Sequence, residues 1–188
     1  MFGNAFLHKN SDLDMIEGKY VNLRALEIED LEIHKKWRNH KVNRRHTREY
    51  RLLNMINQKD WFEFISKDNP PKNIMFGVTS KQKKLIGVCG LTYIDWKNKH
   101  CEISIILYKT KWQLTKEAKE VISILTNYGF GELNMHRLWV EIFDTIPENM
   151  KLFESMNFQR EGIMREKLGR EKKWHDSVIY SRLVSDKK

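Results

Sequence analysis

Hydrophobic and polar residues alternate in two rhythms along the chain, and together these rhythms predict a mixed sheet with helices packed on it. Apolar residues at every second position predict strands, and apolar residues three or four positions apart predict helices. The predicted strands are 19–26, 73–79, 84–94, 99–107, 136–143, 158–165 and 176–183. The predicted helices are 27–40, 57–67, 113–130 and 147–156. The order βααβββαβαββ indicates a mixed α/β sheet flanked by helices.

Finer signals lie inside the first two predicted helices. In the first, the spacing predicts that Ile28, Leu31, Ile33 and Trp37 face inward. In the second, Asn57 is the expected N-cap residue, because an asparagine side chain accepts a hydrogen bond from a free backbone N–H of the first turn.

The three strands between residues 73 and 107 are joined by short polar turns, TSKQKK and DWKNK. Such turns are typical of an antiparallel meander, so the sheet is expected to be mostly antiparallel. A chain of 188 residues can bury one core without disulfides or metals. We therefore expect an N-terminal extension over residues 1–16 and a single domain over residues 17–188.

The composition indicates what kind of partner the protein binds. The net charge of +9 suits acidic partners such as phosphates, nucleotides, nucleic acid or acidic protein surfaces.

Cys89 and Cys101 lie in apolar strands without further clustered ligands, so we expect reduced, buried thiols and no metal site. No stretch reaches transmembrane length and the start does not resemble a signal peptide, which favours a cytoplasmic protein without a membrane anchor.

The turn before the third predicted helix reads YKTKWQLTKEA and is the first candidate site. A strand that leads into a helix often binds a phosphate-bearing cofactor there, usually through glycines, yet none occurs between Gly90 and Gly129. Two interpretations stay open. Lysines such as Lys111 hold an anion at the helix start by charge, or Thr110 and Gln113 form a capping box that closes the helix on itself.

Four stretches taken in order resemble the GNAT family of acyl-CoA-dependent N-acyltransferases. They are VNLRALEIEDLE, KLIGVCGLTYIDWKNKHCEISIIL, YGFGELNMHRLWVEIF and KLFESMNFQREGIMRE, the last followed by KKWHDSVIYSRL. The resemblance covers about residues 17–184 and is closest to the branch with ribosomal-protein N-terminal acetyltransferases and acetyltransferases of nucleotide-linked amino sugars. The words WRNH and DWFEFI look more like the amino-sugar enzymes.

This resemblance implies acetyl-CoA as co-substrate, no metal, and a pyrophosphate at the start of the central helix. Thr110, Gln113 and Thr115 stand where the family has Gln or Arg, Gly, and Gly or Ala. Phe153 replaces a tyrosine that often returns a proton to the thiolate. The backbone near Leu107 would bind the cofactor's amide-rich arm. The implied cofactor-binding residues are Leu107, Tyr108, Lys109, Gln113, Leu114, Thr115, Lys116 and Phe153.

The resemblance also implies the groups for the reaction. Glu102, in CEISIIL, would draw a proton from the attacking amine; the alternative is an edge glutamate paired with a cation such as His100. Trp37, Asn39 and Trp61 would line the acceptor pocket, although aromatic residues at helical spacing also occur in cores.

The favoured function is acetyl transfer from acetyl-CoA to a primary amine by direct attack, as a monomer or homodimer. The acceptor would be a nucleotide-linked amino sugar or a protein N-terminus. The alternative is a non-catalytic GNAT-fold protein that binds nucleic acid, the ribosome or an acidic partner through the basic stretches 35–51 and 165–173. Nucleic acid is the less favoured partner.

Overall fold

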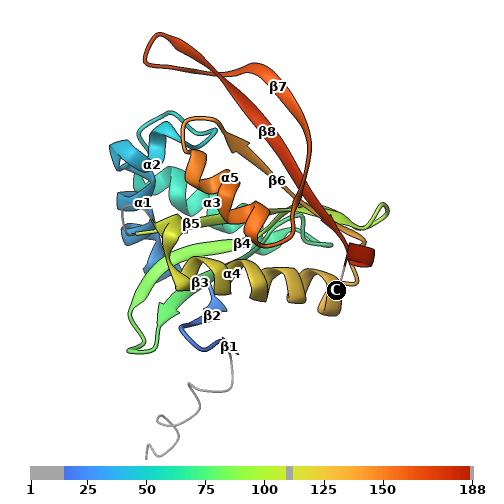
Figure 1. Cartoon of the computed structure of the whole chain (residues 1–188). Helices are drawn as coiled ribbons and strands as arrows, with labels where there is room; N and C mark the ends of the chain where they lie inside the picture. The colour runs from blue at the N-terminus through green and yellow to red at the C-terminus, as the bar shows by residue number, and fades with distance from the viewer. Residues whose placement is uncertain (1–14, 109–111, 187–188) are drawn as a thin grey trace, which may run out of the picture.

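The computed structural model describes residues 15–108 and 112–186 and shows an eight-stranded sheet with helices packed on it (Figure 1). The strand order is β1-β2-β3-β4-β5-β6-β8-β7. All neighbours are antiparallel except β5 and β6. The strands are β1 (Met15–Glu17), β2 (Val21–Ala25), β3 (Ile74–Ser80), β4 (Leu85–Asp95), β5 (His100–Leu107), β6 (Arg137–Phe143), β7 (Gln159–Arg170) and β8 (Lys173–Leu183). The predicted mixed, mostly antiparallel α/β sheet is confirmed.

The helices lie on the sheet in two groups. In Figure 1, α4 and α5 cross the face turned to the viewer, and α1, α2 and α3 gather at one end of the sheet. The α-helices are α1 (Leu31–Asn39), α2 (Lys41–Arg45), α3 (Met55–Lys67), α4 (Lys116–Asn127) and α5 (Pro147–Ser155). Short 3-10 turns cover Ile28–Asp30, Trp112–Leu114 and Val184–Asp186, and a π-helical turn covers Tyr128–Glu132.

The inward face of α1 differs from the sequence prediction. Leu31 is buried, but Ile28 and Ile33 are 51% and 36% exposed, so the prediction for these two residues is wrong. His34 lies on the buried face instead and is 2% exposed. A pattern drawn from apolar residues alone passes over a histidine, which explains the error.

The N-cap of α3 also differs. The helix begins at Met55, and Asn54 is its N-cap: the side chain of Asn54 accepts a hydrogen bond from the backbone N–H of Asn57. The side chain of Asn57 accepts one in return from the N–H of Asn54, so the two residues form a capping box. The predicted cap was therefore three residues late.

The observed start of α4 differs from the start predicted in the candidate turn YKTKWQLTKEA. The helix begins at Lys116, and Thr115 is its N-cap, with Oγ1 accepting from the N–H of Ala118 at 3.2 Å. Gln113 lies in the preceding 3-10 turn. The predicted start at Gln113 was thus three residues early; Thr110, the other member of the predicted capping box, lies outside the described residues.

Replacing Thr115 with alanine is expected to lower the free energy of unfolding by about 1 kcal/mol, because the N–H of Ala118 loses its acceptor. Urea denaturation of the purified protein measures the effect. A serine at the same position keeps the hydroxyl and serves as the control, with stability close to that of the wild type. Equal losses in both variants would show that the methyl group of Thr115 matters more than the cap.

Both cysteines lie in the core. Cys89 on β4 and Cys101 on β5 are 0% exposed and form no disulfide, which confirms the prediction of buried, free thiols. Burial raises the pKa of the Cys101 thiol to about 12, and it raises that of Cys89 as well. Neither thiol is reactive as a thiolate at neutral pH.

The structure contains elements that the sequence pattern did not predict. β1 pairs with β2 and includes Met15 and Ile16, so the expected boundary between residues 16 and 17 falls inside a strand. The strands predicted at 158–165 and 176–183 extend to Arg170 and from Lys173, forming a long hairpin. The hairpin tip contacts the chain after α2, because Nη2 of Arg170 donates to the carbonyl oxygen of Thr47 at 2.8 Å.

Near the middle of the sheet, β5 and β6 pair over a short distance only. The parallel ladder joins His100–Glu102 to Arg137–Trp139 and then stops. β5 continues to Leu107 and β6 to Phe143, so the two strands separate beyond Glu102 and leave a gap in the sheet. This gap defines the position of the candidate site.

Candidate functional site

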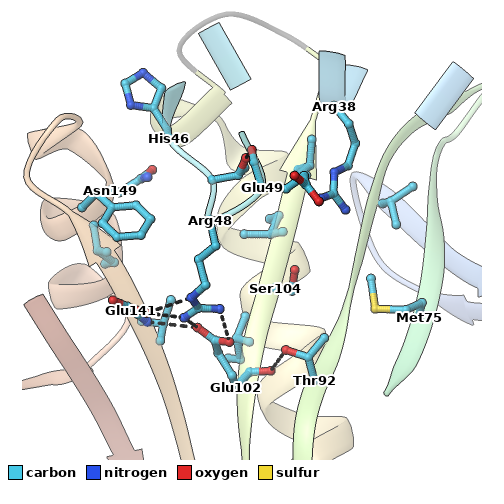
Figure 2. A pocket seen from close by; sticks show the side chains of 18 of the residues that line it. Arg38, His46, Arg48, Glu49, Met75, Thr92, Glu102, Ser104, Glu141 and Asn149 are labelled. Carbon is cyan, nitrogen blue, oxygen red and sulfur yellow. Dashed lines mark hydrogen bonds and ion pairs between the residues drawn. The ribbon is translucent and has the colours of Figure 1, made fainter. Parts of the chain in front are cut away.

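A cavity of about 680 Å³ opens where β5 and β6 separate. This volume lies within the ~300–1,000 Å³ typical of small-molecule sites. The cavity is lined by residues of β3, β4, β5, β6, α1, α3, α5 and the irregular segment between α2 and α3, and Figure 2 shows it from close by. The site therefore lies where β5 and β6 separate in the centre of the sheet, with the N-terminal helices along one side.

The backbone of β5 turns unpaired peptide groups toward this cavity. The N–H of Tyr108 donates to the carbonyl of Ile86 on β4, whereas the carbonyl of Lys99 accepts from the N–H of Arg137 on β6. Successive residues of a strand point their peptide groups to opposite sides. The peptide groups of residues 103, 105 and 107 therefore face β6, and those of residues 105 and 107, beyond the end of the ladder, face the gap.

Glu102 lies at the point where the two strands part. It is 4% exposed, and its Oε1 accepts a hydrogen bond from the backbone N–H of Glu141 at 3.3 Å. This N–H is the next donor that β6 directs at β5, so the Glu102 carboxylate takes the place of the next rung of the ladder. A carboxylate at this position ends the pairing without leaving the Glu141 amide unsatisfied.

Arg48, from the segment between α2 and α3, holds this carboxylate from above. Its Nη1 and Nη2 donate to Oε2 and Oε1 of Glu102 at 2.9 and 2.6 Å, and its Nε donates to Oε2 of Glu141 at 2.8 Å (Figure 2). Burial alone would lower the pKa of Arg48, but the hydrogen bonds and charges of the two glutamates raise it above its ordinary value. We call these three side chains the Arg48–Glu102–Glu141 cluster.

The alternative interpretation of Glu102, an edge glutamate paired with a cation such as His100, is wrong in its position and in the example of His100, but right that a cation pairs with Glu102. Glu102 lies in the centre of the sheet, and Nε2 of His100 lies 3.7 Å from Oδ2 of Asp95. A cation does hold Glu102, but it comes from a segment more than fifty residues away in the sequence.

The far wall of the cavity is formed by α1, α3 and the loop before α3. His34 lies with its ring centroid 5.3 Å from that of Trp61, and burial lowers the pKa of His34 to about 3, so its imidazole is neutral at pH 7. Nη2 of Arg51 donates to Oε2 of Glu49 at 2.8 Å, and this bond lowers the pKa of Glu49 to about 2. Arg38 also lines this wall.

A second cavity of about 320 Å³ lies beside the turn that leads into α4. It brings together the predicted substrate residue Trp37 and the predicted cofactor residues Tyr108 and Gln113. The rings of Trp37 and Tyr108 lie 6.4 Å apart. Asn149 of α5 lines both cavities, so the two are neighbours along one groove.

Other predicted cofactor residues are spread around the turn. The side chain of Leu114 is 69% exposed, and Nζ of Lys116 lies 5.6 Å from the centroid of the Tyr20 ring. Thr115 caps α4, and Lys109 lies outside the described residues. The structure thus brings Tyr108 and Gln113 into a cavity but leaves Leu114 and Lys116 outside both.

Phe153 and Trp61 line the first cavity, and Asn39 lines neither. Phe153 is 2% exposed and packs edge-on against Phe158, with ring centroids 5.2 Å apart. Both polar atoms of the Asn39 amide bond the backbone of Leu53, each at 2.8 Å. Asn39 therefore fastens α1 to the start of α3, and we leave it out of the proposed acceptor site.

Sequence reasoning missed Arg38, Arg48 and Glu141 as site residues. The two arginines lie in the basic stretch 35–51, which was interpreted only as a surface for acidic partners. Glu141 carried a usable signal, since a charged residue inside the apolar strand RLWVEIF calls for a buried partner.

Two absences hold for residues 15–108 and 112–186. No helix there is both long and apolar enough to span a membrane. No group of three or more histidine, cysteine, aspartate or glutamate side chains there is arranged to hold a metal ion.

Comparisons with known proteins point to one family. Residues 23–179 match the model of the acetyltransferase (GNAT) domain. The chain is 32% identical over 89 residues to the uncharacterized N-acetyltransferase p20 of Bacillus licheniformis. The matched region covers 47% of this chain and 49%, about half, of p20. It is 28% identical over 140 residues to the uncharacterized N-acetyltransferase YoaA of Bacillus subtilis, covering 72% of this chain and 78% of YoaA.

A solved structure extends the likeness to the fold. The crystal structure of spermidine N-acetyltransferase from Vibrio cholerae in complex with CoA and spermine superposes with a TM-score of 0.81 at 24% identity, covering 88% of this chain and 96% of that one. The predicted family and fold are confirmed, and the two Bacillus relatives are both named N-acetyltransferases. Because the family model spans most of its length, this chain belongs to the GNAT acetyltransferase family.

Proposed function

We propose that the protein transfers the acetyl group of acetyl-CoA to a primary amine. The observation that carries the proposal is the separation of β5 and β6 beyond Glu102, which opens a cavity bordered by unpaired peptide groups of β5. The arm of CoA contains amides, and the free backbone groups between Ile103 and Leu107 can pair with them as a neighbouring strand would. The acetyl group would then lie near the Arg48–Glu102–Glu141 cluster.

The reaction would proceed by direct attack. The amine nitrogen bonds to the thioester carbonyl carbon, a backbone N–H of β5 stabilises the oxyanion, and the carbon–sulfur bond breaks to release CoA thiolate. Glu102 would take the proton that the amine gives up. Both of its oxygens already accept hydrogen bonds, but a carboxylate has about four acceptor positions, which leaves room for an amine or a water. Phe153 has no proton to return, so water would protonate the thiolate.

The structure weighs against the alternative of a nucleic-acid surface. Several arginines of the basic stretch 35–51 are already paired inside the molecule. Arg45 bonds Glu171, Arg48 bonds two glutamates, Arg51 bonds Glu49, and Arg44 donates to the carbonyl of Tyr50. Phosphates would have to compete with these partners.

A thermal melt with and without acetyl-CoA tests the proposal. Acetyl-CoA at one hundred times its dissociation constant is expected to stabilise the protein by roughly 2.7 kcal/mol. Adenosine 3′,5′-bisphosphate is the matched control, because it carries phosphates of CoA without the arm that the cleft would hold. An equal shift with both ligands would assign binding to surface charge, and no shift at millimolar acetyl-CoA would contradict the proposal.

The acceptor is the finer part of the proposal. The sequence resemblance favours a nucleotide-linked amino sugar or a protein N-terminus, and the solved neighbour from Vibrio cholerae is described in complex with spermine. These acceptors differ in charge: a polyamine carries several cations, whereas a nucleotide-linked sugar carries phosphates. The charges of the cavity wall can therefore distinguish between them.

A further inference from the structure

We propose, resting on the acetyltransferase function above, that the acceptor is an amine that also carries an anionic group, a carboxylate or a phosphate. Its ammonium would lie at the Arg48–Glu102–Glu141 cluster and its anion would bind the guanidinium of Arg38. The proposal follows from the way the charges of the cavity wall pair with one another.

The cavity wall carries three arginines and three glutamates, and their pairing makes it bipolar. Arg48 bonds both Glu102 and Glu141. The cluster therefore contains one positive and two negative groups, and its net charge is −1. Arg51 and Glu49 bond each other and sum to zero. Arg38 remains, with a charge of +1. An ammonium and an anion joined in one molecule would complement both ends.

Arg38 is the cation of this wall that lacks a partner of its own. In the described part of the chain its guanidinium makes no salt bridge and no side-chain hydrogen bond, although Figure 2 shows it directed into the cavity. Burial lowers the pKa of Arg38, and the charge of Glu49 offsets this in part. Glu49, however, accepts its hydrogen bonds from Arg51. A guanidinium in such a wall is suited to bind a carboxylate or phosphate through two parallel hydrogen bonds.

The opposite end offers an acceptor for an ammonium. Oε1 of Glu141 is buried and has no hydrogen-bond partner in the described structure, whereas its Oε2 accepts from Arg48. A buried carboxylate oxygen without a donor is unusual and indicates a place for a bound donor. Together with the net charge of the cluster, this oxygen favours a cationic amine beside Glu102.

The same pairing disfavours a polyamine. A second ammonium would have to lie along the wall formed by His34, Trp61 and Arg38. In that wall the imidazole is neutral, and the charged side chain without an ion pair among the described residues, Arg38, is positive. Like charges in a partly desolvated site repel, so spermidine or spermine would bind poorly.

Matched pairs of amines test the proposal through the release of CoA from acetyl-CoA. We would compare glucosamine 6-phosphate with glucosamine, and 4-aminobutyrate with 4-aminobutanamide, and include spermidine. The wild type is expected to use at least one anionic member with kcat/KM about tenfold or more above its neutral partner, mainly through KM. The phosphate and carboxylate pairs distinguish the two kinds of anion.

Arg38→Met is expected to remove this preference by weakening the anionic member alone, whereas Arg38→Lys retains part of it. Lys59→Ala is the matched control: Lys59 is exposed on α3, and its removal takes away one positive charge without touching the cavity. The control is expected to keep the full preference. A role of Arg38 in folding alone would lower kcat/KM equally for both members of a pair.

The outcomes separate this proposal from the function on which it rests. If acetyl-CoA does not stabilise the protein, the acetyltransferase proposal fails. If acetyl-CoA binds but the neutral amine or spermidine is used as well as the anionic one, the anionic acceptor is excluded and the acetyltransferase remains. If acetyl-CoA binds and no amine is acetylated, thermal melts of the CoA-saturated protein with each amine decide: equal shifts in wild type and Arg38→Met overturn the proposal.

Discussion

Replacing Glu102 with glutamine is expected to lower turnover by at least about tenfold, which corresponds to about 1.4 kcal/mol in the barrier. The amide cannot take a proton from the amine. In addition, its NH₂ group would point a donor at either Arg48 or the N–H of Glu141, both of which are donors themselves. Steady-state rates at saturating acetyl-CoA measure the loss, and the affinity for acetyl-CoA should stay close to that of the wild type.

Glu161→Gln is the matched control for this change. Glu161 on β7 also accepts two hydrogen bonds from one arginine, Arg137, but the pair is exposed and lies outside the cavity. Its replacement should leave turnover near the wild-type value. If Glu102→Gln also keeps full turnover at every pH, Glu102 does not act as the base.

Replacing Arg48 with methionine is expected to lower the free energy of unfolding at pH 7 by roughly 2–3 kcal/mol. The change leaves the Glu102 and Glu141 side chains, each 6% exposed, without their cation. The estimate stays below that for a fully buried pair because the Arg48 side chain is 42% exposed. Urea denaturation of both proteins measures the difference.

Arg51→Met is the control for Arg48→Met. The Arg51 side chain is 63% exposed, so its pair with Glu49 should contribute at most about 1 kcal/mol. Equal losses for the two variants would show that the cluster is not the source of the effect.

The sequence was sufficient to predict the sheet, most of the helices and Glu102, because these depend on periodicity and on short words in a fixed order. Tyr108 and Gln113, which it predicted to bind the cofactor, line a cavity just after the end of β5, and their role stays a prediction. The branch of the family that the resemblance favoured, and with it the amino-sugar or N-terminal acceptor, stays a prediction.

Periodicity could not predict the partners of Glu102. Arg48 lies 54 residues before it, in a segment without regular structure, and its neighbours in the sequence are equally basic. Which arginine of that stretch enters the sheet depends on how α1, α2 and α3 pack. The long hairpin was missed for another reason: residues 165–173 are charged and mostly exposed, so their side chains show no alternation.

The short ladder between β5 and β6 also has a mechanical consequence. The sheet consists of two antiparallel blocks, β1–β5 and β6–β8, and in the described chain the strand ladder between them joins three residue pairs. The Arg48–Glu102–Glu141 cluster adds a side-chain connection at the same place, since Arg48 bonds a glutamate in each block. A cofactor arm bound in the gap would add contacts between β5 and β6 beyond the three-pair ladder. The rigidity of the sheet would therefore depend on whether the gap is filled.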